Sequence, residues 1–226
     1  MKIISLGHST FVLSLEGKKI LMDPFFPTKS SQEIIKNITP DYVFLTHGHA
    51  DHVSGLSEVP LADDTQIIAP FELAALLEKK GYKNVIPCNP GLRFNEIVNT
   101  EIRCVPAVHS STYEDVVAGV PVGFIIKYND RVLYISGDTS LTIEMQLLPE
   151  YYGHIDWAVL PVGGQFTMDW KDLPLACKML QCRQVIGCHF NTFEAISIDT
   201  QAAVEFCRKQ NIALQLPSVG TEIDLG

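Results

Sequence analysis

The residues best suited to chemistry in this sequence are His47, His49, Asp51 and His52, which lie within six positions of one another. Imidazole and carboxylate groups are ligands that zinc, manganese, iron and nickel accept in proteins. Side chains two positions apart point the same way on an extended segment, so His47 and His49 can share one ion. Asp51 and His52 come at the start of the next turn, where they can face a second ion. This segment therefore predicts a metal site.

Three further ligand-type residues each end a predicted strand elsewhere in the chain, namely His109, Asp138 and His189. A closed structural zinc site is satisfied by four ligands, so this surplus predicts two ions. Strand ends at one edge of an open α/β sheet converge on the functional cleft, which gives distant residues a physical reason to meet. The sequence thus predicts two divalent cations, either zinc, manganese, nickel or iron, bound by His47, His49, Asp51, His52, His109, Asp138 and His189.

The order of these motifs along nearly the whole chain resembles the metallo-β-lactamase superfamily. The histidine-rich run is preceded by Asp23 at the end of an early strand and followed by a lone histidine, Gly137-Asp138-Thr139 and a final histidine. The resemblance implies that Asp138 bridges the two ions and that Asp23 orients ligands through hydrogen bonds. It further implies a first ion held by His47, His49 and His109 and a second held by Asp51, His52 and His189.

Finer motifs are similar to one branch, the uncharacterised metal-dependent hydrolases grouped with ascorbate-6-phosphate lactonase. The motifs are Gly7-His8-Ser9, Asp23-Pro24-Phe25, His109-Ser110-Ser111, Gly137-Asp138-Thr139, Gly163-Gly164-Gln165-Phe166-Thr167-Met168 and His189-Phe190-Asn191-Thr192-Phe193. After the Phe-Thr-Met run those relatives usually continue with Gly-Pro and acidic residues, whereas this chain has Asp169-Trp170-Lys171-Asp172. The departure predicts a different loop on the substrate side.

Other residues at the predicted strand ends are candidates for substrate contact or for structural support. Gly163-Gly164 follows an apolar strand, and glycine there would let a substrate approach the backbone closely. His8 has two interpretations, a hydrogen-bonded structural histidine or a catalytic group near the substrate. Asp23 precedes Pro24, so a strand-ending turn is the alternative to its orienting role. The residues predicted to contact the substrate are Gly164, Phe166, Thr167 and Asn191.

The elements that must position these residues form two similar halves, each rich in strands and each with helices. Turn residues Glu16-Gly17 and Asn129-Asp130 predict hairpins. Strands are predicted at 3–6, 10–15, 18–22, 42–46, 66–69, 101–108, 122–128, 131–136, 157–161 and 184–188, and helices at 71–80, 141–148, 173–181 and 200–210. We predict an α/β fold, a four-layer αββα sandwich of two mixed β-sheets with helices on the outer faces. We expect one domain over residues 1–226.

The net charge and the composition limit the classes of partner and the cellular location that we expect for this protein. The formal net charge is -9 and Lys and Arg are scattered, so no basic stripe predicts binding to nucleic acid. No apolar run reaches the roughly 18 to 20 residues of a membrane span, and no signal-peptide core is visible, which favours a cytoplasmic protein. The spacing of the six cysteines fits no disulfide framework, so we expect free thiols. A homo-oligomer is left open.

These observations predict a metal-dependent hydrolase of a small molecule. A water shared by the two ions, its pKa lowered toward about 7, would attack an electrophilic carbon or phosphorus. Asp51 or Asp138 would receive the proton, and with His8 they form the predicted catalytic set. The branch resemblance favours a lactone, an ester or a phosphodiester as substrate. The alternatives are a phosphodiesterase of the phospholipid-cleaving type and a metal-binding or regulatory module without turnover.

Overall fold

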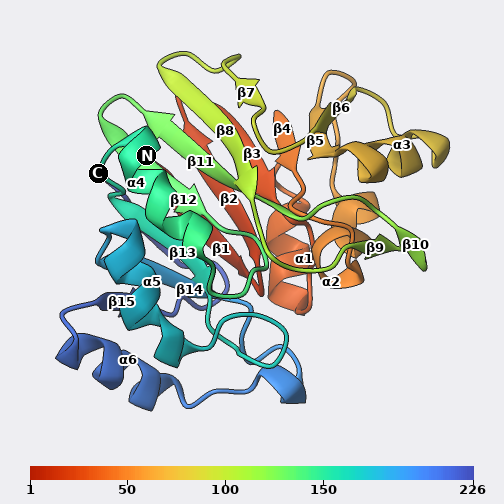
Figure 1. Ribbon diagram of the computed structural model, residues 1–226. Coiled ribbons are helices and arrows are strands. Elements are labelled where there is room, and N and C mark those ends of the chain that lie inside the picture. Colours follow the sequence, from red (N-terminus) through yellow and green to blue (C-terminus); the bar gives the residue numbers. More distant parts are fainter.

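The computed structural model describes residues 1–226, and its centre is a pair of seven-stranded β-sheets packed face to face with helices on both outer sides (Figure 1). The first sheet has the order β16-β1-β2-β3-β4-β5-β6. Its strands are β1 (Lys2–Gly7), β2 (Thr10–Leu15), β3 (Lys18–Met22), β4 (Tyr42–Phe44), β5 (Gln66–Pro70), β6 (Val85–Cys88) and β16 (Glu222–Asp224). This is the four-layer αββα sandwich that the sequence predicted.

The second sheet has the order β15-β14-β13-β12-β11-β8-β7. Its strands are β7 (Arg93–Phe94), β8 (Thr100–Pro106), β11 (Val122–Tyr128), β12 (Arg131–Ile135), β13 (Trp157–Pro161), β14 (Gln184–Cys188) and β15 (Ala213–Gln215). A separate small hairpin pairs β9 (Thr112–Tyr113) with β10 (Val116–Val117). The α-helices are α1 (Lys29–Ile35), α2 (Ala50–Val53), α3 (Phe71–Lys79), α4 (Leu147–Tyr152), α5 (Leu173–Leu180) and α6 (Thr200–Lys209). Four short 3₁₀ turns are η1 (Ser54–Glu58), η2 (Ile143–Gln146), η3 (Trp170–Asp172) and η4 (Glu194–Ile196).

Alternation along the strands builds the core. On β2, Phe11, Leu13 and Leu15 belong to the cluster that fills the space between the sheets, whereas Val12 belongs to the cluster beneath the outer helices. Successive side chains of a strand point to opposite faces, so one sequence can bury both sides of a sheet. Phe44 of the first sheet meets Phe124 of the second edge to face, with ring centroids 5.1 Å apart. The sheets are thus joined through a continuous apolar layer.

The strand directions bring seven loops to one edge of the sandwich, at the bottom of Figure 1. β3, β4 and β5 are parallel, as are β12, β13 and β14, and all of these strands end at this edge in a loop except β5, which runs directly into α3. β1 runs antiparallel to β2, which runs antiparallel to β3, so β1 also ends at this edge. The same reasoning through β11 places the end of β8 there. The residues that follow these strands include all the predicted metal ligands.

The prediction of a helix over residues 141–148 was wrong in where the helix begins and ends. We predicted a helix over 141–148, but the chain first makes the 3₁₀ turn η2, and α4 then continues to Tyr152. The segment before it is held extended, because Thr139 O accepts from Met168 N and Ser140 N donates to Val108 O. These contacts delay the start of the helix. Helix α1 was missed although Thr28 and Ser31 form a capping box at its N-terminus.

Two other expectations can be compared directly with the structure. All six cysteines are buried and free, as predicted from their spacing. The Glu16-Gly17 hairpin turn is confirmed, with φ of 49° and 76° at the two residues, the left-handed geometry that two-residue hairpins use. None of the helices combines the length and the apolar character that crossing a membrane requires.

Candidate metal centre

Three histidines form the first group of converging ligand atoms. His47 and His49 come from the loop after β4, and His109 comes from the segment after β8. The Nδ1 atom of His49 lies 3.0 Å from Nε2 of His47 and 3.3 Å from Nε2 of His109. Burial lowers the pKa of His47 well below its usual value and lowers that of His49 and His109 as well. The three rings therefore favour the neutral form, whose free lone pair can bind a cation.

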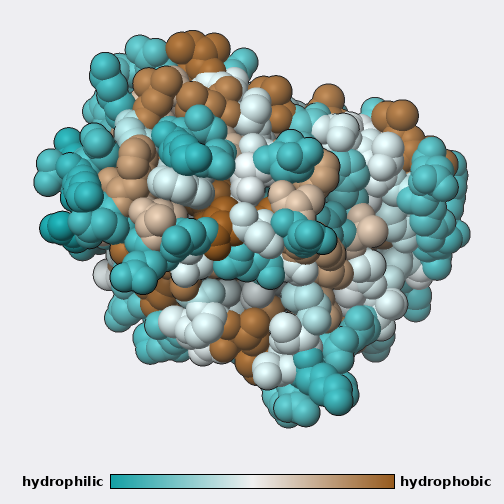
Figure 2. Space-filling model, turned by 90° about the horizontal axis from the view of Figure 1, so that it is seen from below, coloured by the Kyte–Doolittle hydropathy of each residue, from teal (hydrophilic) through white to brown (hydrophobic).

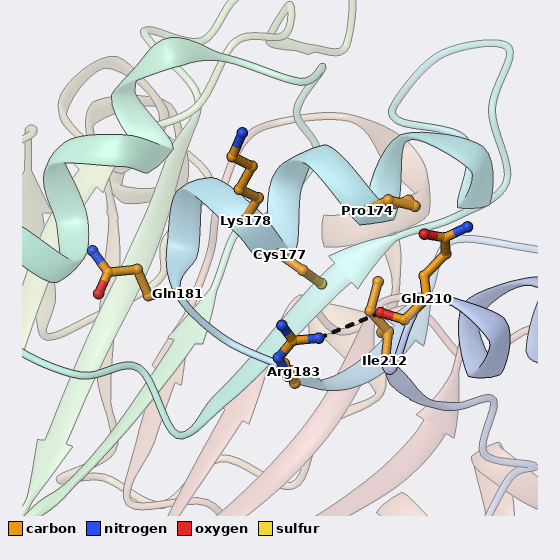
Figure 3. A pocket seen from close by; sticks show the side chains of 7 residues that line it. All are labelled: Pro174, Cys177, Lys178, Gln181, Arg183, Gln210 and Ile212. Carbon is orange, nitrogen blue, oxygen red and sulfur yellow. Dashed lines mark hydrogen bonds between the residues drawn. The ribbon is translucent and has the colours of Figure 1, made fainter.

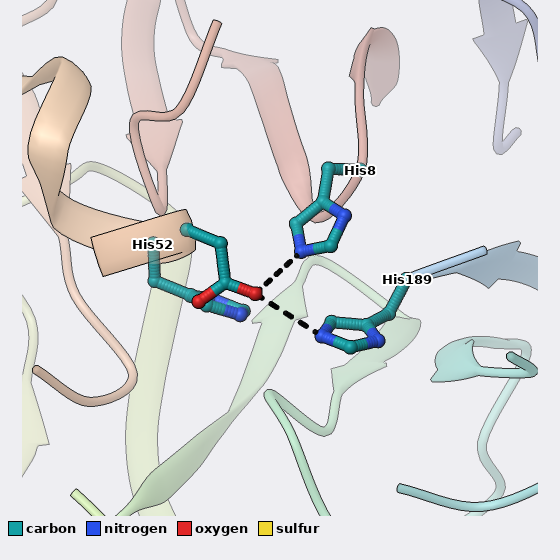
Figure 4. Close-up of side chains that lie close together, drawn as sticks. His8, His52 and His189 are labelled. Carbon is teal, nitrogen blue, oxygen red and sulfur yellow. Dashed lines mark hydrogen bonds and ion pairs between the residues drawn. The ribbon is translucent and has the colours of Figure 1, made fainter. Parts of the chain in front are cut away.

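A second group contains His52, Asp51 and His189. His52 and Asp51 lie in the short helix α2, and His189 directly follows β14. Asp51 Oδ2 lies 3.5 Å from His189 Nε2, and both His8 and His189 point toward this oxygen in Figure 4. His52 is completely buried, so the surrounding protein atoms hold its ring in one position. These residues form a second cluster of possible ligand atoms with His8.

Asp138 stands between the two groups. Its Oδ2 atom lies 3.1 Å from Nε2 of His189 and 3.4 Å from Nε2 of His52. The same oxygen is 3.6 Å from Nε2 of His109, which belongs to the first group. Asp138 is only 2% exposed and follows β12 across Gly137, where φ is +60°. One carboxylate thus touches the ligand atoms of both groups.

Cations fit this arrangement. In each cluster the ligand atoms lie within 4.8 Å of one another. His52 Nε2 and Asp138 Oδ1 are buried without any hydrogen-bond partner, which is costly for polar atoms in the interior. Both belong to the residues that would coordinate a cation, and a bound cation would satisfy them. The donor set of imidazoles and carboxylates suits zinc, manganese, iron or nickel.

Electrostatics at the second group also favour positive charge. Burial would lower the pKa of His52, but the carboxylates of Asp138 and Asp23 raise it well above its usual value. Burial opposes a charge on His189 too, yet Asp138 and Asp51 raise its pKa to about 9. Burial would raise the pKa of Asp51 and Asp138, but hydrogen bonds and charges of the neighbouring histidines lower both. Two ionised carboxylates therefore face this space.

Asp23 supports the ligands from behind. Its carboxylate accepts hydrogen bonds from Thr46 N at 2.8 Å and from Thr46 Oγ1 at 2.7 Å. Oδ2 also lies 2.8 Å from Nδ1 of His52. A hydrogen bond at Nδ1 directs Nε2 of the same ring toward the ligand cluster, and such partners tune ligand basicity. Asp23 has φ of +42°, an unusual backbone for a non-glycine residue that the surrounding contacts maintain.

His8 lies inside the protein rather than at the solvent. Its side chain has no exposed surface, and Nε2 contacts Asp51 Oδ2 at 3.0 Å. Nδ1 contacts Thr192 Oγ1 at 2.9 Å. Its backbone carbonyl accepts from His189 N at 3.0 Å, which ties the loop after β1 to the loop after β14. His8 therefore contacts the Asp51 carboxylate from the interior of the protein and does not face solvent.

The residues predicted to contact substrate occupy varied places on this edge. Gly164 is buried and Phe166 is 57% exposed, and both lie on the loop after β13 with Thr167. Asn191 uses its Oδ1 to accept from Ile198 N at 2.7 Å, so it holds its own loop. At Gly163 an added Cβ would meet His189 O at 2.2 Å. The close approach that glycine permits there is that of the protein's own backbone.

Sequence reasoning missed three supporting hydroxyl groups. Thr46 Oγ1 lies 3.0 Å from Nδ1 of His47, and Thr192 holds His8. Ser111 Oγ accepts from Gly48 N at 3.1 Å, which fixes the histidine loop against the second sheet. Each hydroxyl lies in or beside a motif that was recognised, but hydroxyl residues are common in loops and their partners lie far along the chain. Only the fold identifies them.

A hollow of about 470 Å³ lies away from this centre (Figure 3). Lys178 and Gln181 come from helix α5 and its end, while Arg183 precedes β14 and Ile212 precedes β15. These are the starts of strands, at the edge opposite His189. Arg183 Nη1 donates to the carbonyl of Gln210 at 3.3 Å. Figure 3 shows the Lys178 side chain pointing away from Arg183. The hollow contains none of the predicted site residues.

A protein family and individual relatives match this chain over most of its length. The family described as the β-lactamase superfamily domain matches residues 2–189. A UPF0173 metal-dependent hydrolase from Methylacidiphilum infernorum is 36% identical over 222 residues, covering 97% of each chain. A second from Flavobacterium johnsoniae is 33% identical over 228 residues and covers 100% of each.

Solved structures show the same similarity. Igni18, a metallo hydrolase from Ignicoccus hospitalis, superposes with a TM-score of 0.84 at 29% identity, covering 98% of this chain and 97% of that one. An isothiocyanate hydrolase from Delia radicum gut bacteria superposes with a TM-score of 0.80 over 99% of this chain and 98% of that one. Its identity is 20%, so this likeness concerns the fold.

Proposed function

This chain belongs to the metallo-β-lactamase superfamily of metal-dependent hydrolases, and we propose that it uses two divalent cations to hydrolyse a small-molecule lactone, ester or phosphodiester. The observation that carries this proposal is the position of Asp138 Oδ2, which lies within 3.6 Å of imidazole nitrogens from both ligand groups. We assign the first ion to His47, His49 and His109, the second to Asp51, His52 and His189, and the bridging position to Asp138.

When bound, the two cations would lower the pKa of water at the site and polarise the scissile bond. The protein's own contribution is to hold the ligands and to handle protons. Asp51 has 26% of its side chain exposed, whereas Asp138 has 2%. Asp51 can therefore be reached from solvent, and we assign to its carboxylate the proton released during attack on the substrate. Asp138 acts as a fixed negative charge between the ligand groups.

His8 and Asp23 are positioning residues in this proposal. His8 contacts Asp51 through Nε2 and is itself held by Thr192. Asp23 contacts the Nδ1 side of His52 and the backbone of Thr46. Removing such outer partners typically lowers metal affinity or activity about 10- to 100-fold. The catalytic role that the sequence suggested for His8 is thus proposed to act through Asp51.

The test is metal analysis combined with an activity panel. Protein purified without chelator, then supplemented with zinc, manganese or nickel, should bind two ions per chain and hydrolyse at least one substrate among aryl esters, lactones and bis(4-nitrophenyl) phosphate. Chelator should abolish the turnover and metal should restore it. Saturation at one ion in every metal would contradict the dinuclear assignment. Two bound ions without turnover of any substrate would instead favour the metal-binding or regulatory module.

A further inference from the structure

Two phenylalanines stand beside the second ligand group. Phe25 follows β3 and Phe193 follows β14, so they approach from different sheets. Their ring centroids lie 5.3 Å and 5.6 Å from that of His8, in edge-to-face contact, and 6.1 Å from each other. His8 in turn contacts Asp51. Phe193 is 45% exposed, so this aromatic pair presents apolar surface beside His8, the residue whose Nε2 contacts Asp51 Oδ2.

Further apolar side chains are exposed on the loops of the same edge. Val108 immediately precedes His109 and is 48% exposed, and Phe166 on the loop after β13 is 57% exposed. Figure 2 looks at the molecule from below, onto this edge, and shows hydrophobic side chains near the middle of the face between hydrophilic ones. Exposed apolar groups gathered at a site of chemistry mark a surface for an apolar ligand.

The charged side chains of these loops are all acidic. The loops are 7–9, 23–28, 45–53, 107–121, 136–142, 162–169 and 189–199, and their charged residues other than histidine are Asp23, Asp51, Glu114, Asp115, Asp138, Asp169, Glu194 and Asp199. Two lysines closely follow these loops in the sequence: Lys171, whose Nζ lies 5.0 Å from the centre of the Trp170 ring, and Lys29, which is exposed. Lys80, which caps the end of α3, pairs with Glu114.

These charges disfavour an anionic substrate tail. Proteins usually hold a phosphate or carboxylate group with arginine or lysine, often in bidentate hydrogen bonds. Asp23 and Asp138 are buried, but Glu114, Asp115, Glu194 and Asp199 are exposed on these loops, and their charges would repel an anionic tail. A neutral apolar tail would instead lose water contact against Phe25 and Phe193, which is favourable.

We propose that the substrate is uncharged outside its reacting bond and carries an apolar or aryl group that packs against Phe25 and Phe193. This inference rests on the proposed function and narrows its substrate class. For a neutral ester, water adds to the acyl carbon and the bond from that carbon to the leaving oxygen breaks. One proton of the water goes to the leaving oxygen by way of Asp51. The products are a carboxylic acid and an alcohol or phenol.

The first test compares substrates that differ in tail charge. The metal-loaded protein is assayed with 4-nitrophenyl hexanoate, with the 4-nitrophenyl monoester of adipic acid, which has the same chain ending in a carboxylate, and with bis(4-nitrophenyl) phosphate. We expect kcat/KM for the hexanoate to exceed that for the adipate by about tenfold or more. Equal values for the two esters, or a preference for the phosphate diester, would overturn the inference.

The second test uses variants of the aromatic pair. Phe193→Ala and Phe25→Leu, which preserves most of the half-buried volume, should each lower kcat/KM for the hexanoate about tenfold with unchanged metal content. Tyr151→Ala is the matched control, because Tyr151 is an aromatic residue that is 73% exposed on helix α4, which leads to the start of β13 at the edge opposite the site loops. An equal loss in the Tyr151→Ala protein, or no loss in the other two, would contradict the inference.

A binding measurement separates this inference from the proposed function. Titration calorimetry with N-phenylhexanamide, a neutral amide analogue, should show binding to the parent and the Tyr151→Ala protein and weaker binding to Phe193→Ala. If no ester, lactone or phosphate diester turned over with two ions bound, the proposed hydrolysis would be defeated, yet the amide titration would still decide the apolar contact. No binding, or equal binding by Phe193→Ala, would overturn it.

Discussion

At the scale of single residues, Asp138 has the most demanding position in this molecule. It is almost completely buried, and its Oδ2 atom approaches three imidazoles that belong to both ligand groups. A carboxylate has two oxygens and a negative charge, so it can serve two cations at once, whereas an imidazole offers one lone pair. The charge and the shape of this side chain can be separated by a single substitution.

We predict that Asp138→Asn loses at least one of the two ions and lowers turnover by more than about a hundredfold, a larger effect than that of outer partners. The amide keeps the shape but removes the charge that offsets the cations. Metal content and kcat are the measurements. Asp115→Asn, an exposed site-loop carboxylate, should leave both unchanged. Full metal content with near-parent turnover in Asp138→Asn would refute the bridging assignment.

The sequence located the candidate ligands but not the residues that hold them. His47, His49, Asp51 and His52 are recognisable because they are neighbours in the chain. Thr192 is 184 positions away from His8, and no local pattern relates the two. The burial of His8 depends on rings and loops from both sheets, so its orientation toward Asp51 also required the fold. Local spacing identifies ligand types, whereas their supports arise from tertiary contacts.

At the scale of elements, the loop after β13 and the loop after β14 determine where His189 lies. Gly163 packs so closely that an added Cβ would meet His189 O at 2.2 Å and Ile196 Cβ at 2.9 Å. Because the first of these is a backbone atom, the contact cannot be relieved by a rotamer change. The loop of His189 would have to move.

We therefore predict that Gly163→Ala destabilises the protein by about 1 to 3 kcal/mol, as overpacking does, and weakens metal binding at His189. Urea unfolding and metal titration are the measurements. Gly187→Ala is the control, since its new Cβ would meet the movable end of Leu216, and its metal affinity should stay near that of the parent. Unchanged metal affinity in Gly163→Ala would show that this packing does not position His189.

Elements with strong local signals were predicted well. The strands at 10–15 and 18–22 have the bounds of β2 and β3, because alternation and the Glu16-Gly17 turn specify them locally. The helix predicted at 141–148 begins later, since Thr139 and Ser140 are held by backbone contacts with Met168 and Val108. Such contacts join segments about 30 residues apart and leave no trace in local periodicity.

At the scale of the whole molecule, the candidate ligands come from both sheets. His47, His49, Asp51 and His52 follow β4 of the first sheet, whereas His109, Asp138 and His189 follow strands of the second. Protein hydrogen bonds also join the sheets at this edge, from Val122 N to Thr46 O at 2.9 Å and from His189 N to His8 O at 3.0 Å. Bound cations would add links of the same kind between the two halves.

A ligand that binds only the folded state stabilises it according to its concentration relative to its dissociation constant. At about 100 times that constant, each ion contributes about 2.7 kcal/mol. A change of 1 kcal/mol shifts Tm by about 2 to 4 °C in a chain of this size, so removing one ion should lower Tm by about 5 to 11 °C. Calorimetry before and after chelation, followed by the addition of metal, measures this shift.

Asp138→Asn should show a smaller difference in Tm between its metal-loaded and chelated forms, because it holds fewer ions from the outset. The apolar layer between the sheets contains no ligand, so the chelated protein should still unfold cooperatively. A Tm that does not respond to chelator in protein proven to lose its metal would show that the ions do not connect the two sheets.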